Sequence, residues 1–395
     1  MKIKVFALII AILTIFCTAI PISCSNGNNL GTDKFFTSVT VAQANGETNS
    51  EPTLNSTPSQ NTEISLLSGD IYDVCKDYEW YITDNYNPEN KDVFAPTPLK
   101  ISWQSKSQPL YYVLDVSTSA DMSNAKTYVT FDNNLTFDYL FMGYTYYYQI
   151  QAKFENRIVK SRIFKFSTAY LPRTVYVDDK VSNTRDWGGY YSKNGTHRLR
   201  QGIVYRGGKL EEITPKGKEI MLVDLGIKTD LDVRGDGSAQ TSNSPLGNSV
   251  NYIETTGPYY YDNTHGINVD GTYRQALVTE IKAFANPDNF PIYVHCSLGR
   301  DRTGTICFLI QALCGVNDAD MLRDYEISMM SSAGRADNQT AFDMINTAFR
   351  GMYNYVRYYT KSGSLADNVE AFMLDIGITK DEISAIKSNM LEEIK

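Results

Sequence analysis

The chain has 395 residues, which is too long for one ordinary domain and predicts two or three. A hydrophobic content of 42% is enough to build real cores. The net charge of −8 argues against nucleic acid and against an anionic membrane surface as the main partners.

The N-terminus has the pattern of an export signal. Two lysines precede an uncharged apolar run from Val5 to about Ile22, and small and polar residues follow. We expect residues 1–23 to be a signal peptide, with an uncleaved membrane anchor as the alternative. The segment Pro21-Ile-Ser-Cys24 resembles a bacterial lipoprotein cleavage box, which implies a lipid on Cys24 and membrane contact only through that anchor. The expected location is extracytoplasmic, as a cell-surface lipoprotein or a secreted protein.

Two segments of different composition follow the export signal. Residues 24–69 are rich in Asn, Ser, Thr and Gly with few large apolar groups, and predict a disordered tether. Residues 70–170 change to short alternating strands, such as Leu99–Trp103, and predict an antiparallel β-sandwich. The run from Leu140 to Ala152 resembles the Leu-x-Pro-Gly-x-x-Tyr corner of fibronectin type III domains, with Met142 in place of Pro. No catalytic group of residues is evident here, so we expect a spacer or a weak binding module.

Residues 171–395 predict an α/β domain with a mostly parallel sheet flanked by helices. Thr214 and Pro215 have the pattern of a helix start, and Gly226 that of its end. The predicted strands are 203–206, 227–233, 250–255 and 292–294. The predicted helices are 214–226, 270–285, 303–314, 319–332, 338–361, 365–376 and 379–394, the last opening with a capping box of Thr379 and Glu382.

The stretch from Pro291 to Thr305 joins a short apolar strand to an apolar helix. Free N–H groups and the positive end of the dipole at a helix N-terminus favour an anion. Gly299 allows the connecting backbone to curl, so that the amides of Ser297, Leu298, Gly299, Arg300, Asp301 and Arg302 point inward. This stretch is therefore predicted to be a phosphate-binding loop.

The same loop carries its own nucleophile. Cys296 lies in a field that stabilises a thiolate, because helix N-termini and nearby Arg lower a thiol pKa to roughly 3.5–7.5. Arg302 offers a planar two-pronged donor for two phosphoryl oxygens, and Thr303 can donate a hydrogen bond to the sulfur. These residues predict covalent chemistry, in which a cysteinyl-phosphate forms and water then hydrolyses it.

The run His-Cys-x-x-Gly-x-Asp-Arg-Thr-Gly resembles the active-site signature of bacterial tyrosine and dual-specificity phosphatases, with Arg300 in place of the usual Lys. Three upstream segments also resemble motifs of that family. They are Asn183-Thr-Arg-Asp-Trp-Gly-Gly189, Tyr205-Arg-Gly-Gly208 and Leu225-Gly-Ile-Lys-Thr-Asp-Leu-Asp-Val-Arg234, in which Trp187 and Gly207 depart from the family pattern. The resemblance implies a cysteine-phosphatase fold over the whole 171–395 domain.

Two carboxylates are candidates for the acid that protonates the leaving oxygen. Asp301 lies in the loop and is narrowly favoured, while Asp232 ends a strand and has an alternative role in holding Arg302 or Arg234. His295 is expected to point away from the substrate and to order the loop through hydrogen bonds. Arg300 is expected to meet the rest of the substrate.

The predicted function is that of an exported phosphatase acting on phosphotyrosine, and also on phosphoserine or phosphothreonine. A phosphoinositide or inositol-phosphate phosphatase is the alternative, because a basic residue at position 300 is associated with those substrates in the family. A non-catalytic surface binding protein is the third interpretation. The expected partner is a phosphorylated protein or a phosphoinositide, with no nucleic acid, and no metal or cofactor is expected because His197 and His265 lack metal-ligand spacing.

Overall fold

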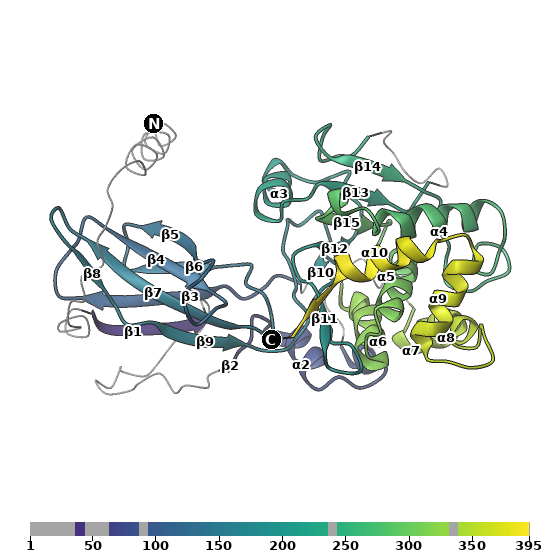
Figure 1. Cartoon of the computed structure of the whole chain (residues 1–395), viewed down its shortest axis with the longest axis horizontal. Coiled ribbons are helices and arrows are strands. Elements are labelled where there is room, and N and C mark those ends of the chain that lie inside the picture. Colours follow the sequence, from purple (N-terminus) through teal and green to yellow (C-terminus); the bar gives the residue numbers. More distant parts are fainter. Residues whose placement is uncertain (1–35, 44–62, 87–93, 236–242, 332–338, 395) are drawn as a thin grey trace.

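The computed structural model describes residues 36–43, 63–86, 94–235, 243–331 and 339–394. A β-sandwich and an α/β unit lie at opposite ends of the chain's longest axis (Figure 1). The predicted signal peptide and Cys24 lie outside the described residues. Within those residues, no helix combines the length and the apolar character needed to span a bilayer.

The β-sandwich consists of two sheets. The first has the order β1 (Phe36–Gln43), β3 (Leu99–Ser105), β6 (Asn134–Phe137). The second has the order β2 (Glu63–Ile64), β9 (Phe164–Thr168), β7 (Thr145–Lys153), β4 (Tyr111–Ser117), β5 (Lys126–Thr130), with β8 (Ile158–Lys160) also paired to β7.

Strict alternation in the strand sequences explains why these sheets face each other. Along β7 every second residue is buried, and these side chains meet Leu99, Ile101 and Trp103 of β3 in one core. The Tyr146 hydroxyl accepts a hydrogen bond from the Phe141 amide at 2.7 Å and so closes the corner before β7. The likeness to a fibronectin type III domain stays a prediction.

The tether predicted for 24–69 is wrong where the chain forms β1 and β2. Strand β1 pairs antiparallel with β3 from Phe36 to Gln43, because its Thr- and Val-containing sequence favours an extended backbone. The average composition of the long segment hid this short strand.

The predicted start of the sandwich at residue 70 is also corrected. Helix α2 (Gly69–Lys76) and the turn η1 (Ile82–Asn85) lie on the α/β unit. The apolar side of α2 packs with Ile327 and Met330. The Glu326 carboxylate accepts hydrogen bonds from Tyr78, Tyr81 and Thr83.

The α/β unit has a five-stranded sheet that is parallel except at one edge, in agreement with the predicted mostly parallel sheet. Its order is β10 (Arg185–Asp186), β12 (Val204–Gly207), β15 (Ile292–His295), β13 (Thr229–Asp232), β14 (Asn251–Glu254), and β10 pairs antiparallel with β12. Strand β15 is therefore central, and all four of its residues are buried. A second small sheet pairs β11 (His197–Leu199) with β16 (Leu391–Glu393).

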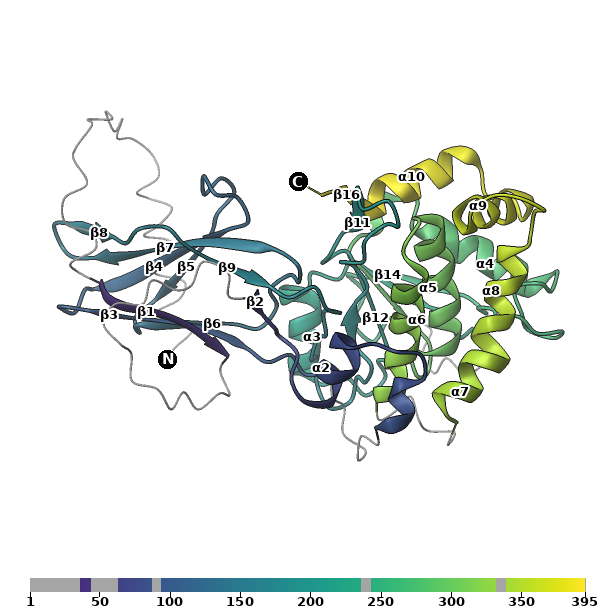
Figure 2. The same cartoon turned by 90° about the horizontal axis from the view of Figure 1, so that it is seen from below.

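Helices surround this sheet, and Figure 2 shows α5 beside α6 with α8 and α9 further out. The helical elements are α3 (Pro215–Glu219), η2 (Ile220–Asp224), α4 (Thr272–Ala283), η3 (Pro287–Asn289), α5 (Asp301–Leu313), α6 (Asp318–Glu326), η4 (Ile327–Met330), α7 (Ala341–Met344), η5 (Ile345–Phe349), α8 (Arg350–Arg357), α9 (Leu365–Asp375) and α10 (Lys380–Met390). The predicted capping box of Thr379 and Glu382 is present. The last helix ends earlier than predicted, because residues 391–393 form β16.

Polar contacts join the two units. The Gln201 side chain bonds both the amide and the carbonyl of Met142, at 2.9 and 2.8 Å. Arg198 lies 3.6 Å over the Tyr144 ring and pairs with Glu392 at 2.6 Å. The C-terminal strand thus helps to attach the sandwich to the α/β unit.

Candidate active site

The loop after β15 is held from outside by its carbonyl groups. Asn183 donates to the Leu298 carbonyl at 3.0 Å, and Arg206 donates to the Gly299 carbonyl at 2.8 Å. Each trans peptide directs its N–H opposite to its C=O, so the amides that follow point to the other side, toward the hollow of the loop. Gly299 has φ 69°, and a Cβ there would lie 2.3 Å from the Gly207 carbonyl group. A glycine is therefore required at this point of the loop.

Cys296 lies at the base of this loop and is 4% exposed. Burial, and to a smaller extent the charge of Asp301, disfavour its thiolate. Hydrogen bonds from the side chain and amide of Thr303 and the charge of Arg302 outweigh them and lower the pKa of the Cys296 thiol.

Arg302 lies in the first turn of α5 and is also buried. Its Nη1 donates to the Arg234 carbonyl at 3.2 Å, and its guanidinium lies 4.7 Å over the Tyr259 ring. Ring stacking and the carbonyl contact fix the plane of the guanidinium beside Cys296. The two residues expected to attack and to bind phosphate are thus brought together.

Asp301 lies at the N-terminus of α5 and is held on two sides. Its Oδ1 accepts from Arg300 Nε at 2.7 Å and from the Tyr260 hydroxyl. Its Oδ2 accepts from Arg300 Nη2 at 3.2 Å.

Arg300 differs from the expectation that it meets the substrate. Its side chain is 2% exposed, and the guanidinium contacts Asp301 and Gln339. Burial favours the paired orientation because an unpaired guanidinium in this position would be costly. Arg300 therefore orders the loop's own carboxylate in this structure.

Asp232 holds Arg234, which was its predicted alternative role. Its oxygens accept from Arg234 Nε at 2.8 Å and Nη2 at 2.6 Å, and from the Tyr252 hydroxyl at 3.1 Å. Burial works against ionisation, but the bonds and charge of Arg234 and the charge of His295 lower the pKa of Asp232. Glu211 contacts the other side of Arg234 at 2.5 Å.

His295 faces the sheet interior from the last position of β15. Its Nε2 lies 2.9 Å from Asp230, and its Nδ1 lies 3.2 Å from the Cys296 carbonyl. Burial opposes the charged ring, but the Asp230 carboxylate more than offsets it and raises the pKa of His295 to about 9. A charged imidazole therefore anchors the peptide that carries the nucleophile.

Sequence reasoning missed Asp324, the residue that joins two of the upstream motifs. This buried carboxylate on α6 pairs with Arg185 at 2.9 Å and with Arg206 at 2.6 Å. Arg185 in turn contacts Asn183 at 2.5 Å, so both residues that hold the loop carbonyls depend on Asp324. The two motif arginines were a signal that a buried acid was needed, but nothing local marked which one.

Sequence reasoning also missed Glu280. This carboxyl on α4 is 1% exposed and accepts from the Thr255 hydroxyl at 2.6 Å. Burial raises the pKa of Glu280 to about 7, despite the Thr255 bond and the charge of Arg302. A titrating carboxyl thus lies behind the loop, within electrostatic reach of Arg302.

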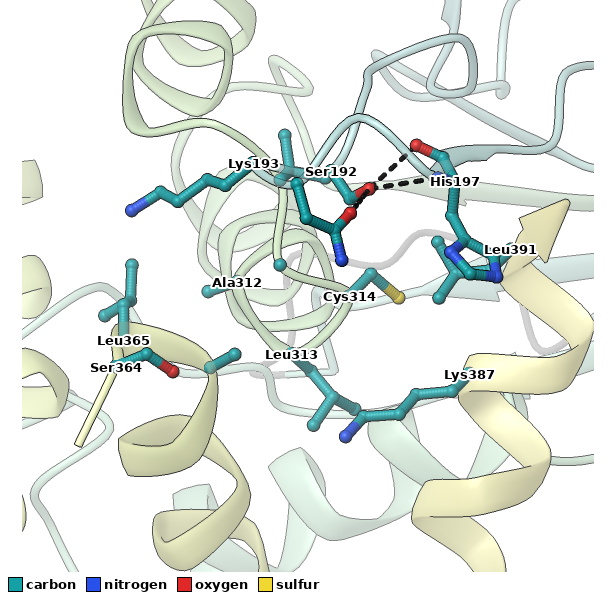
Figure 3. A pocket seen from close by; sticks show the side chains of 14 residues that line it. Ser192, Lys193, His197, Ala312, Leu313, Cys314, Ser364, Leu365, Lys387 and Leu391 are labelled. Carbon is teal, nitrogen blue, oxygen red and sulfur yellow. Dashed lines mark hydrogen bonds between the residues drawn. The ribbon is translucent and has the colours of Figure 1, made fainter. Parts of the chain in front are cut away.

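A separate pocket of about 460 Å³ lies at the other end of α5 (Figure 3). Cys314 and Leu313 line it together with Ser192, His197 and Lys387. None of the loop residues 296–303 lines this pocket. The length of α5, about 18 Å, separates the pocket from the loop. Within the described ranges, no group of three or more His, Cys, Asp or Glu side chains is arranged to hold a metal.

Residues 178–392, more than half of the chain, match the family described as "Tyrosine phosphatase family", and the chain belongs to that family. It is similar to "Putative tyrosine-protein phosphatase H16_A0669" of Cupriavidus necator, with 27% identity over 185 residues, which is 41% of this chain and 65% of the relative. It is also similar to "Putative tyrosine-protein phosphatase OCA1" of Eremothecium gossypii, with 32% identity over 66 residues, or 17% of this chain and 29% of the relative. The chain thus covers less than two thirds of each of these relatives.

The chain also resembles solved structures. The core catalytic domain of the PP-IP phosphatase SIW14 from S. cerevisiae, in complex with citrate, matches with 16% identity and a TM-score of 0.26. That match covers 40% of this chain and 86% of the solved one.

Proposed function

We propose that this protein is a cysteine-dependent phosphatase that hydrolyses phosphotyrosine monoesters, and also phosphoserine and phosphothreonine. The observation that carries the proposal is the buried Cys296, whose thiol pKa is lowered beside Thr303 and Arg302, in a loop whose Leu298 and Gly299 carbonyls are held from outside. Family membership supports the same reaction class.

In the proposed first step, the Cys296 thiolate attacks phosphorus in line with the ester oxygen. The sulfur–phosphorus bond forms, the phosphorus–oxygen bond breaks, and the leaving oxygen takes a proton from Asp301. Arg302 and the loop amides bind the equatorial oxygens, whose charge is greatest in the transition state. In the second step the oxygen of a water molecule attacks phosphorus while Asp301 accepts a proton from that water. The sulfur–phosphorus bond breaks, and Cys296 leaves as the thiolate.

The contacts of Asp232 support Asp301 as the acid. Asp232 has a lowered pKa and its side chain is only 1% exposed, so it is a poor proton donor. Asp301 is also paired with an arginine, but it belongs to the loop that holds Cys296 and its side chain is 17% exposed. Asp301→Asn should slow substrates with poor leaving groups much more than those with good ones, whereas Asp232→Asn should slow both alike. Equal losses in Asp301→Asn would refute this assignment.

A phosphate-release panel tests the function. Wild type and Cys296→Ser are compared on phosphopeptides, phosphoinositides and inositol phosphates, with release lost in the variant. Highest kcat/KM on inositol phosphates would favour the alternative substrate class, although Arg300, the basic residue that motivates that class, is engaged with Asp301 in this structure. No release from any substrate would favour the non-catalytic binding function.

Export and lipidation are proposed from the N-terminal pattern alone. Metabolic labelling with a fatty acid should mark the wild-type protein and not Cys24→Ala. Equal labelling of both would exclude Cys24 as the lipidated residue, and labelling of neither would favour plain secretion.

A further inference from the structure

Two buried tyrosines, Tyr260 and Tyr325, form a chain of hydrogen bonds that ends at Asp301. The Tyr260 hydroxyl donates to Asp301 Oδ1, and the Tyr325 hydroxyl on α6 donates to the Tyr260 oxygen at 2.7 Å. The two rings meet edge to face with centroids 5.8 Å apart. Burial raises the pKa of both tyrosines far above the ordinary value, with the charge of Asp301 acting in the same direction, so both hydroxyls stay protonated.

The backbone of Tyr260 is held as firmly as its side chain. Its φ of 40° is left-handed, which is unusual for an aromatic residue. Its amide donates to the Thr305 hydroxyl at 2.9 Å, and its carbonyl accepts from the Ile267 amide at 2.8 Å. The Thr305 hydroxyl in turn donates to the Asp301 carbonyl at 3.1 Å. An unfavourable conformation that is fixed at three points indicates a position under functional constraint.

We propose that Tyr260 is a positioning residue for the acid of the reaction: it fixes the Asp301 carboxyl and stabilises the carboxylate that remains after Asp301 protonates the leaving oxygen. Tyr325 orients the Tyr260 hydroxyl. The proposal rests on the proposed phosphatase function. Tyr260 keeps its own proton throughout, since the transferred proton moves from Asp301 to the ester oxygen.

The charged and titratable groups that face Asp301 come from every side of it. Arg300 pairs with Asp301 at 2.7 Å, and the Tyr260 hydroxyl, which is bonded to Tyr325, donates to the same carboxyl. The charge of Asp301 also acts on the Cys296 thiol. Arg300 and the Tyr260 hydroxyl both donate hydrogen bonds to the Asp301 oxygens, and such bonds are stronger when the acceptor is charged. Removing the Tyr260 hydroxyl therefore takes one of these bonds away from the carboxylate that forms in the reaction.

The test uses the full chain and compares Tyr260→Phe with wild type. The alkaline limb of the pH–kcat profile should move up by about one pH unit, since a hydrogen bond to a charged group is lost. Below the alkaline limb, kcat should fall roughly threefold with phenyl phosphate, a poor leaving group, because a weaker acid transfers its proton less readily, and much less with 4-nitrophenyl phosphate, which needs little protonation. Tyr325→Phe leaves the Tyr260 hydroxyl in place and should move the limb in the same direction by less.

Tyr261→Phe is the matched control. Its ring is partly exposed and packs against Tyr355, and its hydroxyl has no hydrogen bond to a described residue, so both readouts should match wild type. The inference would be overturned if wild type is active and the alkaline limb does not move in folded Tyr260→Phe and Tyr325→Phe. That outcome would leave the phosphatase function intact. A wild type with no turnover of any phosphate ester would overturn the function and the inference together.

Discussion

Glu280→Gln is the substitution whose effect can be worked out most fully from the structure. The carboxyl is buried on α4, and the Thr255 hydroxyl donates to one of its oxygens at 2.6 Å. Its other oxygen is buried with no hydrogen-bond partner among the described residues. Burial raises the pKa of Glu280 from 4.5 to about 7. Gln has nearly the same shape and still offers an oxygen to Thr255, but it cannot ionise.

The sign of the effect follows from proton linkage. Between pH 4.5 and 7 the folded protein keeps a proton on Glu280 that the unfolded chain has released, so the free energy of unfolding falls as pH rises through this window. This rise in the pKa of Glu280 corresponds to about 3 kcal/mol of the free energy of unfolding, lost on passing from below pH 4.5 to above pH 7. Glu280→Gln should therefore gain about 3 kcal/mol relative to wild type over the same interval.

Thermal unfolding from pH 4.5 to pH 8 measures this gain. For a domain of this size, the difference in Tm between variant and wild type should grow by roughly 5–10 °C as pH rises. Glu219→Gln is the control, because its carboxylate on α3 is exposed and its Tm should follow that of wild type at every pH. A Tm difference for Glu280→Gln that stays constant across the range, or that shrinks with rising pH, would refute the buried neutral carboxyl.

Three further outcomes are expected. Arg302→Lys should lower kcat by roughly a hundredfold with the fold intact, because an ammonium cannot bind two phosphoryl oxygens in one plane; a loss below threefold would contradict its role. Asp324→Asn should lower the free energy of unfolding in urea by roughly 3–5 kcal/mol, since two buried arginines lose their counter-charge. Substitution of an exposed carboxylate, Asp381→Asn, is its control. A cost below about 1 kcal/mol would show that the ion pairs of Asp324 with Arg185 and Arg206 are not a major support. Glu326→Gln should speed hydrogen exchange in residues 67–86, because it weakens charge-assisted bonds to three residues of that segment; unchanged exchange would show that apolar packing alone holds it.

Local patterns were sufficient for much of the fold. The strand before Cys296 and the helix after it were predicted because a short apolar run, a glycine and a longer apolar run are adjacent in sequence. The capping box of Thr379 and Glu382 was predicted for the same reason, since its two residues are three positions apart. The strand β1 was missed because a short extended segment in a polar stretch has no local sign of the partner it pairs with, β3.

By itself, the sequence determined the loop chemistry of this protein: a thiol at a helix N-terminus, with Arg302 and Thr303 in the first turn of α5. These groups are neighbours along the chain, so their spacing fixes their geometry. Asp232 and Arg234, like Arg300 and Asp301, are close in sequence, but only the tertiary structure decided that they pair with each other. It also decided which distant residues join the site. Tyr260 and Asp301 are 41 positions apart, and Asp324 is 118 from Arg206. Contacts across such separations depend on how strands and helices pack, and sequence spacing carries no information about that packing.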